Sequence, residues 1–232
     1  MTTPPAGLRE RKKQATREAL REAALRLALE RGPDRLRVED IAEAAGVSPR
    51  TYNNYFGSRE QAIVSAVTAD REARIAAAVA ARPAGVRLAD AVTEAVVEQY
   101  TDTGERDHRA LLLITTRTAL RDAFLDATVG IEPPLTAVIA QRIGDTGEHT
   151  AHVLAASVAA AVRIALEGWL RPAGAEGADG ADGADGADGA DGADGADGSL
   201  GAGGLVVPSG SLPDQLRAVL APLAPAFDAV ER

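Results

Sequence analysis

Apolar residues recur every three to four positions along most of the chain, and no segment alternates apolar with polar residues as a half-buried strand would. This period predicts an all-helical protein. In the first third of the chain we expect a helix from about Leu8 to Arg31, ended by Gly32-Pro33. Shorter helices at about Val38–Ala45 and Pro49–Tyr55 precede a long one that runs from just after Ser58 to Ala81.

The rest of the chain also has the helical period. The predicted helices are about Val86–Tyr100, Asp107–Ala127, Pro134–Ile143, His149–Leu170 and Pro213–Val230. Within the last of these, Pro222 and Pro225 must break or bend the helix, since proline lacks an N–H and clashes with the preceding turn.

A low-complexity segment separates the last two predicted helices. From Gly177 to Asp197 the triplet Gly-Ala-Asp is repeated seven times. The repeat lacks proline, which disfavours a collagen helix, and its acid spacing does not match the nonapeptide calcium repeat. It has no apolar face to bury and its like charges repel, so we expect residues 173–211 to form a disordered acidic loop.

The composition excludes several classes of site. Without cysteine the chain has no disulfide, thiolate metal site or cysteine nucleophile. Its start has no apolar core of the signal-peptide kind, and the run Val153–Val162, which is apolar except for Ser157, is too short to span a bilayer. We therefore expect a cytoplasmic protein with no membrane partner and no cofactor.

The net charge of −9 is unevenly distributed. Residues 1–60 hold 12 Lys and Arg against 9 Asp and Glu, whereas the remainder holds 13 against 25. A basic cluster marks the first helix, at Arg9, Arg11, Lys12, Lys13 and Arg17. The acidity is thus concentrated away from an N-terminal region that could meet nucleic acid.

The segment from Val38 to Ile63 has helix starts and ends at the positions that a helix-turn-helix requires. Its first helix ends at Gly46, where a left-handed conformation is expected. Ser48 is a good N-cap for the next helix and Pro49 suits that helix's first position. A helix of two turns cannot stand alone, so it must be held by the one before it. Gly57 ends it, and Ser58 to Gln61 matches a capping box for the following helix.

The side chains of the short second helix suit the major groove of DNA. Arg50 can fork onto guanine, and Asn53 and Asn54 can pair with adenine edges. Taken singly, such residues are usually a solvated helix face, and the prediction depends on their conjunction with the caps and the basic cluster. Three of the seven aromatic residues also gather here, and we interpret Tyr52 and Phe56 as core residues.

The same stretch resembles the tetracycline-repressor (TetR) family of bacterial regulators over about residues 10–65. The resemblance is carried by Ala23-Ala24-Leu25, Gly32, Val38, Ile41-Ala42, Ala45-Gly46-Val47-Ser48, Thr51, Tyr55-Phe56 and Ser58-Arg59-Glu60. It implies base contacts from Arg50, Asn53 and Asn54. Phosphate contacts are expected from Arg37, Ser48, Thr51, Tyr55, Ser58 and Arg59. Arg37 departs from the threonine that the family favours, which trades a cap for a charge.

The resemblance implies an all-α fold with three parts: a flexible arm at 1–8, a helix-turn-helix domain at 9–62 and a helical regulatory and dimerisation domain at 63–232. It also implies an unknown small-molecule effector and a homodimer joined through the last two helices. Candidate effector contacts are Thr115, Arg117, Arg163 and Trp169, although a solvated arginine and a packing tryptophan are the commoner roles. His149 and His152 share a helix face without a third ligand, so we predict no metal site.

We therefore predict a one-component transcription regulator, a repressor that binds palindromic operator DNA as a homodimer and is released by its effector. An activator of the same fold and a helical protein-interaction module without DNA binding are the alternatives. An enzyme is not expected, because the three histidines are scattered and no nucleophile lies beside a base.

Overall fold

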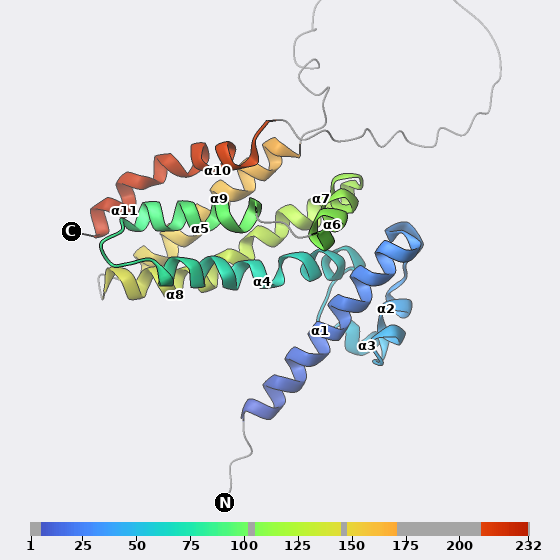
Figure 1. Ribbon diagram of the computed structural model, residues 1–232. Helices are drawn as coiled ribbons and strands as arrows, with labels where there is room; N and C mark the ends of the chain where they lie inside the picture. Colours follow the sequence, from blue (N-terminus) through green and yellow to red (C-terminus); the bar gives the residue numbers. More distant parts are fainter. Residues whose placement is uncertain (1–5, 102–104, 145–147, 171–209, 232) are drawn as a thin grey trace, which may run out of the picture.

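The computed structural model describes residues 6–101, 105–144, 148–170 and 210–231, and all regular structure in these ranges is helical (Figure 1). The predicted acidic loop lies outside the described residues except for its last two positions. An N-terminal part, called the head, contains α1 (Ala6–Arg31), the 3₁₀ turn η1 (Pro33–Arg35), α2 (Val38–Ala44) and α3 (Pro49–Tyr52). Because α1 begins at Ala6, it includes the last residues of the predicted arm.

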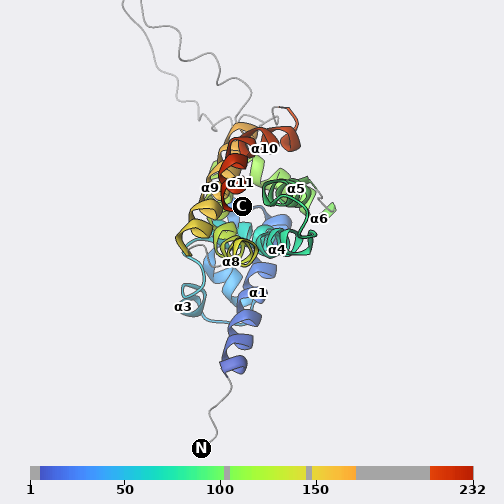
Figure 2. The same cartoon turned by 90° about the vertical axis from the view of Figure 1, so that its left-hand side faces the viewer.

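The remaining helices form a second part, called the body. They are α4 (Arg59–Ala81), α5 (Leu88–Thr101), α6 (Glu105–Thr115), α7 (Thr118–Asp126), η2 (Ala127–Ile131), α8 (Glu132–Ile143), α9 (Glu148–Trp169), α10 (Leu212–Leu220), η4 (Ala221–Leu223) and α11 (Ala224–Val230). The bundle has α4 and α8 on the side of the head, and α10 and α11 on the opposite side (Figures 1 and 2). Between them, α5 contacts α4 and α10, and α9 contacts α8 and α10.

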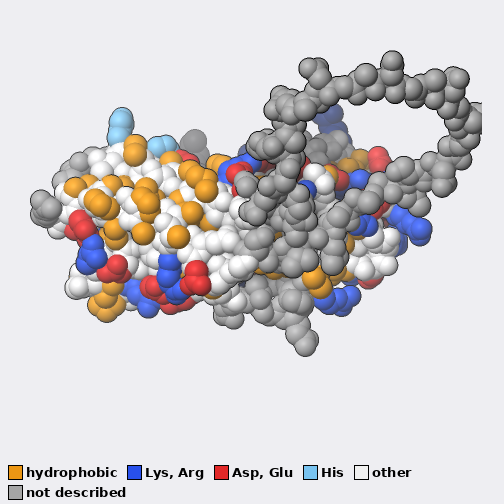
Figure 3. Space-filling model, turned by 90° about the horizontal axis from the view of Figure 1, so that it is seen from above, with side chains coloured by type: hydrophobic (Ala, Val, Ile, Leu, Met, Phe, Trp, Pro, Cys, Tyr) orange, Lys and Arg blue, Asp and Glu red, His pale blue; other side chains and the backbone are white. Residues whose placement is uncertain are grey.

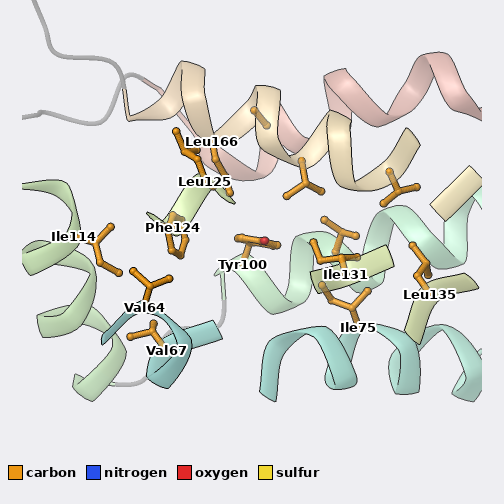
Figure 4. Packing of buried hydrophobic residues seen from close by; sticks show 14 of the residues in the cluster. Val64, Val67, Ile75, Tyr100, Ile114, Phe124, Leu125, Ile131, Leu135 and Leu166 are labelled. Carbon is orange, nitrogen blue, oxygen red and sulfur yellow. The ribbon is translucent and has the colours of Figure 1, made fainter. Parts of the chain in front are cut away.

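One apolar core runs through both parts. In the head, Leu20 and Ala24 of α1 pack with Leu36, Ile41 and Tyr52, all of them fully buried. In the body, buried side chains from α4 to α9 pack together, with Tyr100 and Phe124 near the middle of the cluster (Figure 4). Burial of these apolar side chains is the main favourable term for folding of both parts.

The helix that links the two parts is α4. It begins beside α3 in the head, packs on α1, and continues without a break into contacts with α5, α7 and α8 (Figure 1). A surface ion pair adds a second link, since Arg117 Nε lies 3.0 Å from Asp34 Oδ2 in η1. A groove of ≈ 540 Å³ lies where the two parts meet, lined by Arg17 and Arg21 on one side and by Asp126 and Gly130 on the other.

One predicted helix is divided in two. Instead of a single helix at Asp107–Ala127, α6 ends at Thr115 and α7 begins at Thr118, and Arg117 between them is extended. The hydroxyls of Thr115 and Thr116 donate to the carbonyls of Leu112 and Leu113. Such local bonds compete with the helical ladder, and periodicity alone does not detect them. The break turns α7 back toward α4, where it packs.

The last predicted helix is interrupted at its prolines, as expected. A 3₁₀ turn at Ala221–Leu223 joins α10 to α11. Two segments, Thr118–Ile143 and His149–Trp169, are long and apolar enough to cross a membrane by length and composition alone. The first contains the 3₁₀ turn η2, and both are partly buried within the bundle, as core helices of globular proteins are.

Candidate nucleic-acid interface

The turn between α2 and α3 has the backbone that the sequence predicted. Gly46 has φ +69°, in the left-handed region that favours glycine. The Val47 N–H donates to the Ala42 carbonyl over 2.9 Å and closes the end of α2. At the start of α3, Ser48 Oγ accepts the Thr51 N–H over 3.1 Å, and Pro49 occupies the first turn. Both ends of the turn are therefore hydrogen-bonded within the chain.

The second helix is shorter than predicted. Regular α-helix covers only Pro49–Tyr52, whereas we expected it to reach Tyr55. The backbone stays coiled, since the Asn54 and Tyr55 N–H groups donate three residues back, to the Thr51 and Tyr52 carbonyls. The last turn is thus tightened toward 3₁₀ geometry, a common way for a helix to end.

Two aromatic side chains anchor this helix from beneath, which confirms that they are core residues. Tyr52 is fully buried, Phe56 is nearly so, and their ring centroids are 5.8 Å apart. The Tyr52 hydroxyl donates to the Ser58 carbonyl over 2.7 Å and so joins α3 to the start of α4. Burial raises the pKa of this hydroxyl, with a smaller contribution from the charge of Glu60, so it remains a donor near neutral pH.

Arg59 connects the start of α4 to the segment before α2. Its Nη1 donates to the Leu36 carbonyl over 2.7 Å, and its Nε lies 2.6 Å from Glu60 Oε1. Burial opposes the charge of Glu60, but the hydrogen bond and charge of Arg59, with local hydrogen bonds, lower the pKa of that carboxyl below its ordinary value. Any phosphate that meets Arg59 would share a guanidinium that already binds protein groups.

Some backbone N–H groups at the start of α4 are already hydrogen-bonded to side chains of the same segment. Ser58 Oγ accepts the Gln61 N–H over 3.1 Å, as the capping pattern predicted. The Gln61 side chain reaches back to the Gly57 N–H over 2.7 Å, one residue beyond the position a capping box requires. Fewer N–H groups are therefore open to a phosphate at this end than the sequence suggested.

The outer side of α3 presents the three predicted base-reading residues. Arg50, Asn53 and Asn54 are all exposed, whereas Thr51 and Tyr55 are half-buried beside them. Ser48 and Ser58 are exposed at the two ends of the segment, and Arg37 is exposed at the start of α2. No side-chain cap hydrogen bond is made at the start of α2; the Arg37 N–H instead donates to Asp40 Oδ2 over 2.9 Å.

The basic start of α1 lies next to this surface. A groove of ≈ 760 Å³ is lined on the α1 side by Arg9, Lys12 and Lys13, together with Glu10 and Thr16, and on the α3 side by Thr51, Asn54 and Tyr55. Residues some forty positions apart in sequence thus form one predominantly basic surface. We call it the head groove.

The four candidate effector contacts lie in different places. Thr115 is buried, whereas Trp169 is half-buried at the edge of the core. Arg117 pairs with Asp34 at the head, and Arg163 lies on the surface between Asp126 and Glu167, at 2.9 and 2.8 Å. These residues do not form one cluster in the described structure, and none lines the grooves described above.

The two histidines lie three residues apart at the exposed start of α9. His152 Nε2 lies 3.3 Å from Glu132 Oε1 of α8, while His149 is exposed at the start of α9. Within the described ranges, no three His, Asp or Glu side chains are grouped as a metal site would require.

Among the described residues, one buried arginine is a residue that the sequence analysis did not single out. Arg71 of α4 is only 4% exposed and lies in the core of the body. A signal was present, because Val64, Val67, Arg71 and Ile75 are spaced three or four apart and share the apolar face of α4. We overlooked it because Asp70, Glu72 and Arg74 around it give the segment the composition of a solvated helix.

Comparisons with known proteins agree with this architecture. Residues 20–66 match the family model described as bacterial regulatory proteins, tetR family. The chain is also 36% identical over 148 residues to the HTH-type transcriptional regulator TcmR of Streptomyces glaucescens. That similarity covers 60% of this chain and 65% of TcmR, so the chain spans slightly less than two thirds of its relative. Both names denote regulators rather than enzymes. Residues 20–66 are thus similar to the helix-turn-helix domain of the tetR family of bacterial regulatory proteins, and the chain is similar to a transcriptional regulator over 148 residues.

Proposed function

We propose that this protein is a transcriptional repressor that binds palindromic operator DNA as a homodimer and is released by a small-molecule effector. The observation that carries the proposal is the outer side of α3, where Arg50, Asn53 and Asn54 are exposed. The helix beneath them is held by the Ser48 cap and by the hydrogen bond from Tyr52 to Ser58. Guanidinium and amide groups at these positions match the donor and acceptor pattern of the major groove.

The head groove supplies the second requirement, attraction to phosphates. Arg9, Lys12 and Lys13 flank the side of α3 from which Thr51 and Tyr55 would contact the DNA backbone. Such contacts carry no sequence information, but they determine the position and register of the protein on the duplex. A basic surface contiguous with base-reading side chains favours DNA over a protein partner for this face.

Dimerisation is supported by a predominantly apolar face of the body. On α9 it consists of Val153, Ala156, Ser157, Ala160 and Ile164, with Val153 and Ile164 each 60% exposed. On η4 and α11 it continues through exposed Pro222, Pro225, Ala226 and Ala229, and Figure 3 shows apolar side chains across this end of the body. A two-fold pair joined here would read two half-sites, which one short helix cannot do alone.

Selection from random double-stranded oligonucleotides with the full-length protein, followed by footprinting, tests this proposal. We expect a palindrome protected at two half-sites about one helical turn apart. Affinity should fall steeply with salt as phosphate counterions are released. A variant Arg50→Ala should bind the selected site about 5- to 150-fold more weakly, equivalent to about 1–3 kcal/mol for a lost base contact.

The matched control is Arg26→Ala, which removes another exposed arginine of the head, one paired with Glu30 on α1 and outside the head groove. It should retain wild-type affinity. The proposal fails if no sequence is enriched, or if the two variants weaken binding equally. Binding of a single half-site by a monomer would refute the dimer.

A further inference from the structure

The core of the body contains a buried arginine, two of whose side-chain nitrogens lack a hydrogen-bond partner in the described structure. Arg71 of α4 is 4% exposed, and within the described structure its Nε and Nη1 atoms have no hydrogen-bond partner. Buried polar groups in native proteins are nearly always paired, and a charged one costs much more when it is not. A guanidinium left in this state therefore needs an explanation beyond packing.

Two aromatic rings flank this guanidinium. Its central carbon lies 4.6 Å from the centroid of Tyr100 on α5 and 5.7 Å from that of Phe124 on α7. Figure 4 shows both rings inside the apolar cluster of the body, with the Tyr100 hydroxyl among the hydrocarbon side chains. The rings attract the cation through their π faces, and the Tyr100 side chain also hydrogen-bonds to Arg71. Within the described structure, Nε and Nη1 still have no partner.

The adjacent carboxylate is directed elsewhere. Glu72, the next residue of α4, lines the groove between the head and the body. Burial raises the pKa of the Glu72 carboxyl above its ordinary value, and the charges of Arg21, Arg71 and Arg17 oppose this only in part. Glu72 is not the missing partner, because Nε and Nη1 of Arg71 make no hydrogen bond in the described structure. An acceptor for the free Arg71 donors would have to come from outside the described core.

We propose that Arg71 is the recognition point for the effector, and that this effector is an aromatic carboxylate or an equally planar organic anion. Its charged oxygens would accept from Nε and Nη1, and its ring would stack among Tyr100, Phe124 and the apolar side chains around them. This inference rests on the proposed function, because it names the class of molecule that releases the DNA.

The position of Arg71 suggests how binding of such a ligand in the body would affect the DNA-reading helix of the head. Arg71 is twelve residues after Arg59 on the same continuous helix, about 18 Å along its axis. Binding would pull together α4, α5 and α7, the helices that carry the guanidinium and the two rings. A shift of α4 would move the Tyr52–Ser58 and Arg59–Leu36 contacts that hold α3 in place.

Thermal unfolding of the full-length protein with benzoate and with benzamide tests the inference, because the two probes share a shape and differ in charge. With ionic strength matched by sodium chloride, benzoate should raise the Tm of the wild-type protein and benzamide should not. Equal shifts with the two probes, or no shift with benzoate, would overturn the inference without any mutation.

The variants Arg71→Met and Arg71→Lys locate the effect. With Arg71→Met, the benzoate shift should disappear while the Tm without ligand stays at or above that of the wild type, since an unpaired buried charge has been replaced by an apolar chain of similar length. Arg71→Lys should retain part of the shift. Arg26→Met, which removes a surface arginine, should behave as the wild type. A benzoate shift that survives Arg71→Met, or an unliganded Tm well below that of the wild type, contradicts the inference and assigns Arg71 to packing.

Operator binding by the same proteins separates this inference from the proposed function. Wild type and Arg71→Met should bind the selected DNA equally, and benzoate should release only the wild type. If neither binds DNA although benzoate stabilises the wild type, the proposed function fails and the anion site stands. If both bind DNA and benzoate affects neither, the anion site fails alone.

Discussion

The head and the body of this protein differ in how completely their polar groups are paired. In the head, the Ser48 hydroxyl, the Tyr52 hydroxyl and the Arg59 guanidinium each bond to a backbone group of the same region. In the body, the Arg71 guanidinium is buried between rings with two nitrogens unpartnered in the described structure. These polar groups of the head find hydrogen-bond partners within the chain, whereas two nitrogens of Arg71 in the body do not.

This difference corresponds to two kinds of task. A surface that reads base edges must keep its side chains in one geometry. A helix whose ends are held by hydrogen bonds has few alternative arrangements. A domain that responds to a ligand needs free energy of binding that differs between two states. An unsatisfied buried cation is one source of that difference, since a bound anion would stabilise the state that encloses it.

The largest effect that would test the contrast comes from removing the anchor of the head. Tyr52→Ala deletes a fully buried ring together with its hydrogen bond to Ser58. We expect a loss of about 3–5 kcal/mol in the free energy of unfolding, the usual cost of such a cavity. Urea denaturation followed by circular dichroism measures it. A loss below about 1 kcal/mol would show that the head is not held by this ring. Tyr52→Phe, which keeps the ring, should cost much less.

A smaller effect is expected at the cap of α3. Ser48→Ala removes the oxygen that accepts the Thr51 N–H, and N-cap losses typically cost about 1 kcal/mol. Because α3 is short, weaker DNA binding should accompany the loss of stability. The matched variant is Ser211→Ala, which removes the corresponding cap of α10 in the body. It should lower stability by a similar amount while DNA affinity stays unchanged. Equal losses of affinity in the two variants would contradict the assignment of α3 to the interface.

The smallest effect concerns the surface link between the two regions. Arg117 and Asp34 form an exposed ion pair, and such pairs contribute about 0–1 kcal/mol. A double-mutant cycle with Arg117→Ala and Asp34→Ala should therefore give a coupling energy under about 1 kcal/mol, decreasing with salt. A larger value, insensitive to salt, would mean that this pair and not α4 is the main connection between the head and the body.

The sequence by itself determined the head. Gly46, Ser48 and Pro49 specify a turn and a helix start through short-range backbone chemistry, and the periods of α1, α2 and α4 assign their buried faces. These features depend on neighbours within a few residues, so a linear reading finds them. The length of α3 was overestimated because its last turn is tightened by contacts with the start of α4.

Only the tertiary structure decided which arginine is buried. Arg163 was a candidate effector contact, for which a solvated side chain was the commoner role, and it lies half-buried at the surface between Asp126 and Glu167. Arg71 lies in a charged stretch, yet the packing of α5 and α7 on α4 encloses it. Burial of a side chain depends on which helices cover it, and that is set by contacts between residues far apart in the chain. No local pattern records those contacts.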